Sequence, residues 1–478
     1  MKFWFFALGT SVILLMSVFI FWPVMGHDYS FVIPELIDLH VAWNKFGILN
    51  PYYSPIKCLS TPVWASPVGF NLSFLHLTSI MTDDFFGLVL FIILVSISSF
   101  WGAFRLAIRM KASEIMALYL AAGWTLQGWM IMRASVGHIM YISVGWFPLI
   151  LYLLLKQKTK RRDCLATLLA GILMSQFVFL GAPYAPFMLV MSLGFLVPVI
   201  FYWKQTKVFT GKIFSIKLGV SGILAGILVL PKVLAVSDLM SDFPRTHPLS
   251  KIGFRALSYS FLNLFSFWPH DYKSMVKWWY GNWESVQFMF PLLLLSVIIF
   301  LVLLRDKRTL VRLSVTITYL LFVSLIFSSG VLSDLFQSLP FFKSMHVNPR
   351  WNIVIALPVF ILMTILMTRE NLLPATWLKG LIGLVYLVPL FHLSIENLKM
   401  NYVYGTGYNH VSNRMSYCYE PIFGYNMEYF PLASRLDEID FAKDDYLDPR
   451  CYLPSGKCRP GTPLNANDRS VLESYQLR

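Results

Sequence analysis

The chain has 478 residues, of which 57% are hydrophobic and 13% charged, and its formal net charge at pH 7 is +14. Its mean hydropathy is +0.62, and its repeated apolar runs of about 20 residues are each long enough to cross a bilayer as a helix. The short alternating segments of a membrane β-barrel are missing. Basic residues are dispersed among the apolar runs, so membrane lipids are expected partners and a nucleic acid is not. The composition predicts an all-α polytopic membrane protein.

Eleven apolar runs are predicted to form transmembrane helices. In chain order they cover residues 3–24, 84–104, 114–132, 138–155, 164–181, 184–203, 213–235, 286–304, 311–330, 351–368 and 376–396. The first run follows a lone Lys2, and no small-residue cleavage site comes after it. We therefore expect a retained first helix rather than a cleaved signal peptide.

Short basic connections alternate with long polar ones along the chain. The basic connections lie at 105–111, 156–162, 204–212, 305–312 and 368–379. By the positive-inside rule they face the cytoplasm, which places the N-terminus inside and, after eleven spans, the C-terminus outside. The long polar segments then lie outside the cytoplasm, at 25–83, 236–285, 331–350 and 397–478. The sequence therefore predicts a transmembrane module over 1–396 and a small extracytoplasmic tail or cap over 397–478.

The first outer loop, 25–83, opens with GHDYSFVIPELIDLHVAWNKFG. Helical spacing in this stretch predicts an amphipathic helix in the membrane interface, with Trp43 as an anchor and a buried side formed by Ile33, Leu36, Ile37, His40 and Val41. Asp28 would lie between the first span and this helix, where both a lipid head group and a water-borne acceptor can reach it. A carboxylate there can act as a general base. The alternative is an interfacial cap of the next helix.

A second pair of acids, Asp83 and Asp84, opens the second span. Acidic residues favour helix N-termini, so both can be simple caps. They could instead approach Asp28, because all three lie at the outer surface on consecutive spans. Two carboxylates could then divide the base and orienting roles, or bind a divalent cation. The sequence leaves these alternatives open.

Two basic groups lie next to apolar spans on the predicted outer side. Arg133 and His138 occupy a very short turn between two spans, and a second group just before a later span contains Lys343, His346 and Arg350. A cation beside apolar helices is costly unless it meets an anion, and a lipid phosphate is one such anion. Snorkelling of Arg133 to the surface is the alternative.

Aromatic side chains near these groups are expected to contact the sugar or the acceptor. The segment KWWYGNW, 277–283, contains Trp279 and Tyr280, and Tyr29 follows the predicted base directly. Such residues stack on sugar rings, but an interfacial aromatic belt is the commoner reason for them. No GxGxxG, Walker, HExxH or CxxC pattern is present, which argues against nucleotide-dependent chemistry.

Taken in order, these pieces resemble the GT-C superfamily of integral-membrane glycosyltransferases, in particular its bacterial YfhO-like branch. The resemblance covers roughly residues 1–365. It is carried by the segments GHDYSFVIPEL, FGILNPYYSPIKCLSTPVWASPVGF, VGHIMYISVGWFPLILYLLL, GAPYAP, WYGNWESVQFMFPLLLL and HVNPRWNIVIALPVF. Their shared order is more specific than any single motif.

The resemblance implies a GT-C-like fold in a bacterial inner membrane, with its catalytic carboxylate in the first outer loop. Asp28 matches that position, although it stands in a single HDY rather than the two-acid form of some branches. Such enzymes move a sugar, with inversion, from a polyprenyl-phosphate donor to an extracytoplasmic glycan, lipid or protein. No cofactor is required, but a divalent cation is possible. Arg133, His138 and Arg350 carry over as donor-phosphate contacts.

Two other classes of function fit parts of the pattern. A transporter or lipid flippase predicts polar or broken helices at mid-membrane, and the exceptions to uninterrupted spans here are Gln127, Gln176 and Pro231. A surface-polysaccharide polymerase or ligase shares the location and the substrates. A non-catalytic assembly factor is the remaining alternative, against which loss of activity in Asp28→Asn would argue.

Overall fold

The computed structural model describes residues 2–18, 69–155, 160–182, 184–205, 212–242, 307–329, 348–370 and 377–387, together with single positions that include 32, 36, 39 and 43. Helices contain 89% of the described residues, and no strand occurs among them. Five helical stretches among the described residues are long and apolar enough to cross a membrane, and one of them, Glu114–Ser135, contains two consecutive helices. The described residues are therefore helical as predicted, and several of their helices could cross a membrane.

Four long helices coincide with predicted spans to within seven residues at each end. They are α4 (Asp84–Arg109), α9 (Lys160–Phe179), α10 (Ala185–Tyr202) and α12 (Lys212–Asp242). Shorter or later elements are α1 (Lys2–Val18), α3 (Phe74–Met81), α15 (Lys307–Ser329), η6 (Asn348–Ile355), α17 (Ala356–Glu370) and the helix Trp377–Leu387. The predicted span 286–304 lies outside the described residues, so the count of eleven stays a prediction.

Two predicted spans are interrupted in the structure. The span predicted over 114–132 consists of α5 (Glu114–Thr125) and α6 (Gly128–Val136), because the helix stops at Leu126 and Gln127. The next one begins as α7 (Ile139–Ile142), continues as the 3-10 turn η3 (Ser143–Trp146) and ends as α8 (Phe147–Leu154). Gly137 joins the two spans with φ 94°, a left-handed conformation that glycine adopts without strain.

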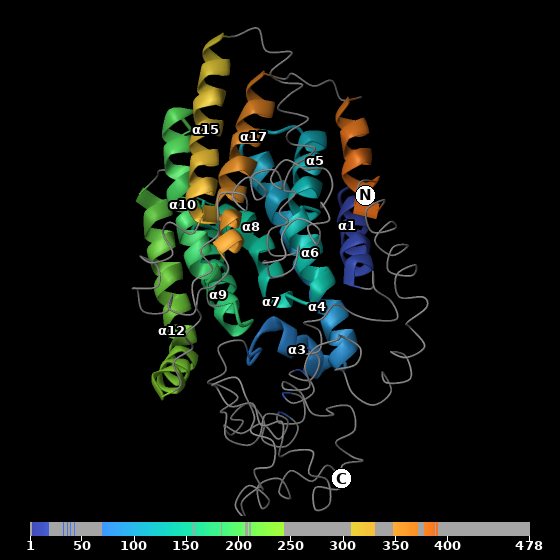
Figure 1. Cartoon of the computed structure of the whole chain (residues 1–478), viewed down its shortest axis with the longest axis vertical. Coiled ribbons are helices and arrows are strands. Elements are labelled where there is room, and N and C mark those ends of the chain that lie inside the picture. Colours follow the sequence, from blue (N-terminus) through green and yellow to red (C-terminus); the bar gives the residue numbers. More distant parts are fainter. Residues whose placement is uncertain are drawn as a thin grey trace, which may run out of the picture.

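The helices form a bundle in which α4 packs against α1, α5 and α8, and α9 packs against α12 (Figure 1). A side chain at Gly102 of α4 would place its Cβ 2.4 Å from Leu149 Cβ of α8, so glycine permits this close approach. The Tyr386 hydroxyl donates to Phe6 O at 2.8 Å and joins the last described helix to α1. Helix α3 lies across the lower end of the bundle in Figure 1.

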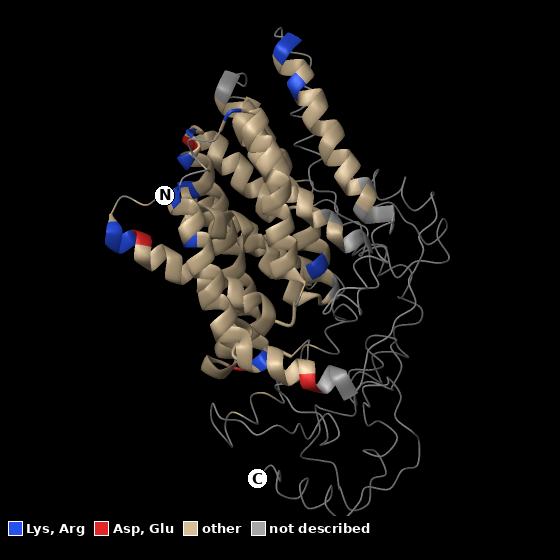
Figure 2. Cartoon of the chain, turned by 90° about the vertical axis from the view of Figure 1, so that its left-hand side faces the viewer, with Lys and Arg blue, Asp and Glu red and all other residues tan. Residues whose placement is uncertain are grey.

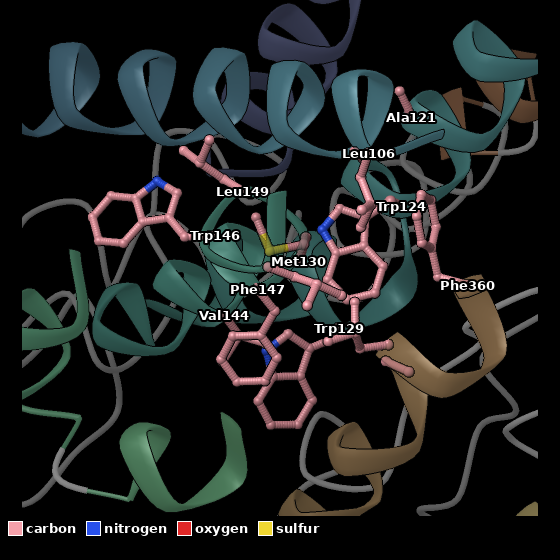
Figure 3. Packing of buried hydrophobic residues seen from close by; sticks show 14 of the residues in the cluster. Leu106, Ala121, Trp124, Trp129, Met130, Val144, Trp146, Phe147, Leu149 and Phe360 are labelled. Carbon is pink, nitrogen blue, oxygen red and sulfur yellow. The ribbon is translucent and has the colours of Figure 1, made fainter. Parts of the chain in front are cut away.

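The centre of the bundle is packed with aromatic side chains from α5, α6, α8 and α17 (Figure 3). Trp124 Nε1–H donates to Gly145 O at 2.9 Å, and the Trp124 ring meets Phe360 edge-on at 5.6 Å between centroids. Satisfying the indole N–H is required for a fully buried tryptophan. In its most apolar window, 83% of the α5–α6 span is buried, against 17% for α12. Helix α12 therefore lies at the periphery of the described bundle.

Basic side chains are unevenly distributed over the described helices. Figure 2 shows most of the Lys and Arg residues in the upper half of the view. Basic residues open α9 and α15 and close α4, at Lys160, Lys307 and Arg109. This distribution is what the positive-inside prediction requires. The orientation of the chain in the membrane stays a prediction.

Candidate functional site

The predicted site residues fall into two groups. Asp28, Tyr29, Trp279, Tyr280, Lys343 and His346 lie outside the described residues, and of Arg350 only the backbone, in η6, is described. Asp83, Asp84, Arg133 and His138 are described with their side chains. The structure therefore does not test Asp28 as the base, and it does show what surrounds the other group.

Of residues 25–68 in the first outer loop, four positions are described, and all four are helical. Val32, Leu36 and Leu39 are fully buried within the hydrophobic core, and Trp43 is partly buried. Their spacing of four, three and four residues is the spacing of positions on one face of an α-helix. The predicted helix is confirmed at these positions.

Leu36 is the one predicted buried position that the structure describes, and it is buried. Val32 and Leu39, which the prediction did not include, are buried as well. The prediction assumed a helix whose apolar side rests on lipid. In the structure, Trp43 lies edge-on to His76 of α3, with ring centroids 5.7 Å apart, so this face contacts protein. The other four predicted positions, Ile33, Ile37, His40 and Val41, lie outside the described residues.

The loop rejoins the bundle through a tight turn at 69–73, followed by α3. Ser73 caps α3 by accepting the His76 N–H at 3.1 Å. The Phe74 N–H, another of the free donors at the start of a helix, donates to Gln176 Oε1 of α9 at 2.7 Å. Leu72 holds φ 55°, in the left-handed region that non-glycine residues rarely occupy. Contacts from a membrane helix therefore fix a strained turn.

Lys232 of α12 holds the same turn from a second helix. Its side chain is 1% exposed, and its ammonium group donates to Gly69 O and, at 3.3 Å, to Phe179 O. Phe179 is the last residue of α9, where carbonyls lose their helical partners. A buried ammonium is costly unless such acceptors surround it. Lys232 therefore joins α12, the end of α9 and the end of the first outer loop.

Asp83 and Asp84 have structural contacts. Asp83 accepts the Phe86 N–H at 2.7 Å and is the N-cap of α4. Asp84 Oδ1 accepts the Ser79 hydroxyl at 2.5 Å, and a Cβ at Gly87 would lie 2.4 Å from Ser79 Cα. The two acids thus fix the return from α3 into α4, as the capping interpretation requires. A catalytic role for them stays a prediction.

Arg133 and His138 lie close together at the end of α6. Arg133 is 1% exposed, and its Cζ lies 4.3 Å from the centroid of the Trp129 ring and 5.6 Å from that of Tyr141. Arg133 Nη1 is in hydrogen-bond contact with His138 Nδ1. Snorkelling therefore does not describe Arg133, because its guanidinium is held inside the protein between aromatic rings.

The contact with Arg133 fixes the protonation pattern of His138. A guanidinium can only donate, so His138 Nδ1 must accept and carry a lone pair. The imidazole is then neutral, with its proton on Nε2. A guanidinium stays protonated and can donate to a phosphate, which is the property that the predicted role requires.

The described part of the chain contains no group of three or more His, Cys, Asp or Glu side chains that could hold a metal ion. Asp28 is not among the described residues, so a divalent cation beside it stays a possibility that the sequence raised. Comparison of the chain with protein-family models, curated proteins and solved structures found no match in any of the three. The resemblance to GT-C enzymes therefore stays a prediction.

Sequence reasoning missed two buried lysines, Lys217 and Lys232, both on α12. Lys217 is 5% exposed and donates to Leu153 O at 2.6 Å, Leu155 O at 2.9 Å and Asp163 Oδ1 at 3.1 Å. A signal for both was present, because a lysine inside an apolar run of membrane-spanning length needs a partner. Their partners, from 53 to 163 residues away in sequence, could not be read from the run itself.

Proposed function

We propose that the chain is a GT-C-type membrane glycosyltransferase, which moves a sugar from a polyprenyl-phosphate donor to an extracytoplasmic glycan, lipid or protein. The sequence resemblance supports this, with Asp28 in the first outer loop. The observation that carries the proposal furthest is the docking of that loop onto the bundle. Val32, Leu36 and Leu39 are fully buried, and Lys232 and Gln176 hold the turn that ends the loop. A simple connector needs neither feature.

In the proposed reaction, Asp28 accepts the proton of the acceptor hydroxyl while its oxygen attacks the anomeric carbon of the sugar. The bond between that carbon and the phosphate oxygen breaks, and polyprenyl phosphate leaves with the electron pair. A single displacement of this kind inverts the anomeric centre. Negative charge grows on the leaving phosphate, so a fixed cation nearby lowers the barrier.

Arg133 is the described residue best suited to that electrostatic role. Its guanidinium is fixed against Trp129 and Tyr141 and bonded to neutral His138. A cation that is already in place needs no reorganisation when charge develops. Arg350, Lys343 and His346 complete the proposed phosphate group in the sequence-based proposal.

The test uses purified full-length protein in vesicles with a panel of polyprenyl-phosphate sugars and a mixture of acceptors. The proposal predicts release of polyprenyl phosphate in equal amount to a covalently glycosylated product of inverted anomeric configuration. Hydrolysis without an acceptor, a product of retained configuration, or no reaction with any donor would contradict it. Use of a diphosphate-linked oligosaccharide alone would favour a polymerase or ligase.

A transporter or lipid flippase is the second candidate, because the break between α5 and α6 favours it. Thr125 and Gln127 at the break are at most 1% exposed, and among the described residues their polar side-chain atoms have no hydrogen-bond partner. Discontinuous helices with such groups are typical of transporters. In the same vesicles, a flippase would move the intact sugar lipid to the other leaflet without releasing polyprenyl phosphate.

A further inference from the structure

Lys232 bonds to two segments of the chain that meet only through tertiary packing. One is the last turn of α9, where the structure accounts for the final carbonyls one by one. Leu180 N–H donates to Gln176 O at 2.8 Å, Ala182 N–H to Phe177 O at 2.9 Å, and Gly181 N–H to Val178 O at 3.1 Å. The next carbonyl, Phe179 O, accepts from Lys232 at 3.3 Å. Lys232 therefore completes the C-terminal cap of α9.

The other segment is the turn from Gly69 to Phe74. Its first carbonyl, Gly69 O, accepts from Lys232, and the N–H of Phe74 donates to Gln176 at 2.7 Å. Between these two anchors, Leu72 holds its left-handed backbone conformation. Strain of this kind persists only where the surroundings over-determine the backbone. Two membrane helices thus impose the shape of the turn.

A continuous path of contacts leads from this turn to the first outer loop. Leu72 N–H donates to His76 Nδ1 at 3.3 Å, and the His76 ring meets Trp43 edge-on at 5.7 Å. Trp43 and Val32 are both helical positions of this loop, and Val32 follows Asp28 by four residues in the sequence. From Lys232 to Trp43, the described links are hydrogen bonds, the backbone of the turn and a ring contact.

We propose that Lys232 is a positioning residue for the reaction. By holding Gly69 it fixes the turn, and through His76 and Trp43 it fixes the buried helical face of the first outer loop that follows Asp28. The effect expected on the reaction follows because Asp28, the proposed base, belongs to the same loop in the sequence. This inference rests on the proposed function for its effect on activity, whereas the positioning itself can be measured without any assay of sugar transfer.

Lys217 provides a matched control on the same helix. It is also buried, and it also donates to carbonyls at a helix end, Leu153 O and Leu155 O. It lies 15 residues before Lys232, or about 22 Å along the axis of a straight helix at 1.5 Å per residue. The segments that it joins are α8 and the start of α9, away from the first outer loop.

The first experiment compares Lys232→Met with Lys217→Met in full-length protein, normalised to the folded fraction. For Lys232→Met we expect kcat to fall about 100-fold, the scale of an ångström-sized misplacement, with KM for the donor changed by less than about threefold. Lys232→Arg, which keeps a cation that can donate to both carbonyls, is expected to recover at least about tenfold. Lys217→Met should keep the wild-type rate per folded molecule.

The second experiment measures accessibility and needs no activity. In a chain whose five native cysteines are replaced by serine, Leu39→Cys places a thiol on the buried face of the loop. Adding Lys232→Met should raise its rate of labelling by a water-soluble maleimide at least about tenfold, whereas adding Lys217→Met should leave that rate unchanged. The proposal is overturned if the thiol is labelled at the same rate in the two lysine variants. It is also overturned if the wild-type enzyme is active and Lys232→Met has the same kcat as the wild type.

The two experiments separate failure of the inference from failure of the proposed function. If the wild-type protein transfers no sugar but Lys232→Met selectively exposes the thiol introduced by Leu39→Cys, the proposed reaction is wrong and the positioning of the loop holds. If transfer occurs and depends on Asp28, while Lys232→Met changes neither kcat nor labelling, the reaction holds and the role of Lys232 is wrong.

Discussion

The two buried lysines of α12 are alike in type, burial and choice of acceptor, yet they join different parts of the molecule. Lys217 ties α8 to the start of α9 and forms an ion pair with Asp163, with N···O 3.1 Å. Lys232 ties the end of α9 to the turn at Gly69. One lysine therefore holds helix to helix, and the other holds the membrane body to the first outer loop.

The comparison teaches that burial of a charge does not by itself mark a functional residue. Both ammonium groups lose their hydrogen bonds to water on burial, and carbonyl oxygens at helix ends replace those bonds. Both lysines are therefore explained as caps of helix ends. What distinguishes them is the segment at the other end of the bond. Lys217 leads to a short connection, whereas Lys232 leads through His76 and Trp43 to the loop that carries Asp28.

The largest expected effect on stability is that of replacing Lys217. Lys217→Met removes one partner of a buried ion pair, which typically costs 3–5 kcal/mol. Asp163 is 24% exposed and can be partly rehydrated, so we expect a loss of about 3 kcal/mol in the free energy of unfolding. Thermal unfolding in detergent measures it, and the double variant Lys217→Met with Asp163→Asn should recover part of the loss. A double variant less stable than Lys217→Met would show that the pair is not the cause.

Each of the two regions that these lysines join also contains a glutamine, which allows a second matched test. Gln176→Leu leaves the Phe74 N–H without its acceptor and should cost about 2 kcal/mol. Gln157 Nε2 donates to Tyr152 O at 3.1 Å and Leu155 O at 2.9 Å in the other region, so Gln157→Leu should cost a similar amount. Only Gln176→Leu should also increase labelling of the thiol in the Leu39→Cys background. Equal labelling in both variants would contradict the claim that only the region around Lys232 holds the first outer loop.

The smallest effect on stability is expected for Ser221, which lies between the two lysines on α12. The Ser221 hydroxyl donates to Thr167 O at 2.9 Å across the contact of α12 with α9. Because Ser221→Ala removes a single neutral hydrogen bond, we expect it to cost about 1 kcal/mol, with neither labelling nor the transfer rate per folded molecule changed. If it exposed the loop as strongly as Lys232→Met does, the effect of Lys232 would reflect general loosening of α12.

Much of the helical framework follows from the sequence, and the polar contacts between helices do not. Apolar runs of about 20 residues locate α4, α9, α10 and α12 because a membrane span must satisfy its own backbone. Arg133 lies four residues after Trp129, so their contact is local and could be anticipated from helical spacing. By contrast, the bond from Lys232 to Gly69 joins residues that are 163 apart in the sequence.

The described positions of the first outer loop show what its periodicity could and could not predict. Several apolar stripes fit the same stretch, and the choice among them depends on what the helix packs against. Leu36 was predicted to be buried and is buried, and Val32 and Leu39 are buried as well. The pattern therefore predicted a helix at these positions, whereas the contact of Trp43 with His76 could not be read from it.

The most direct test of the proposed reaction is the initial rate of sugar transfer per folded molecule in Asp28→Asn. A general base contributes typically 10²- to 10⁴-fold, so we expect the rate to fall by roughly that factor. Glu114→Gln, which makes the same change at an exposed carboxylate at the start of α5, should keep the wild-type rate. Transfer at the wild-type rate by folded Asp28→Asn would contradict the account.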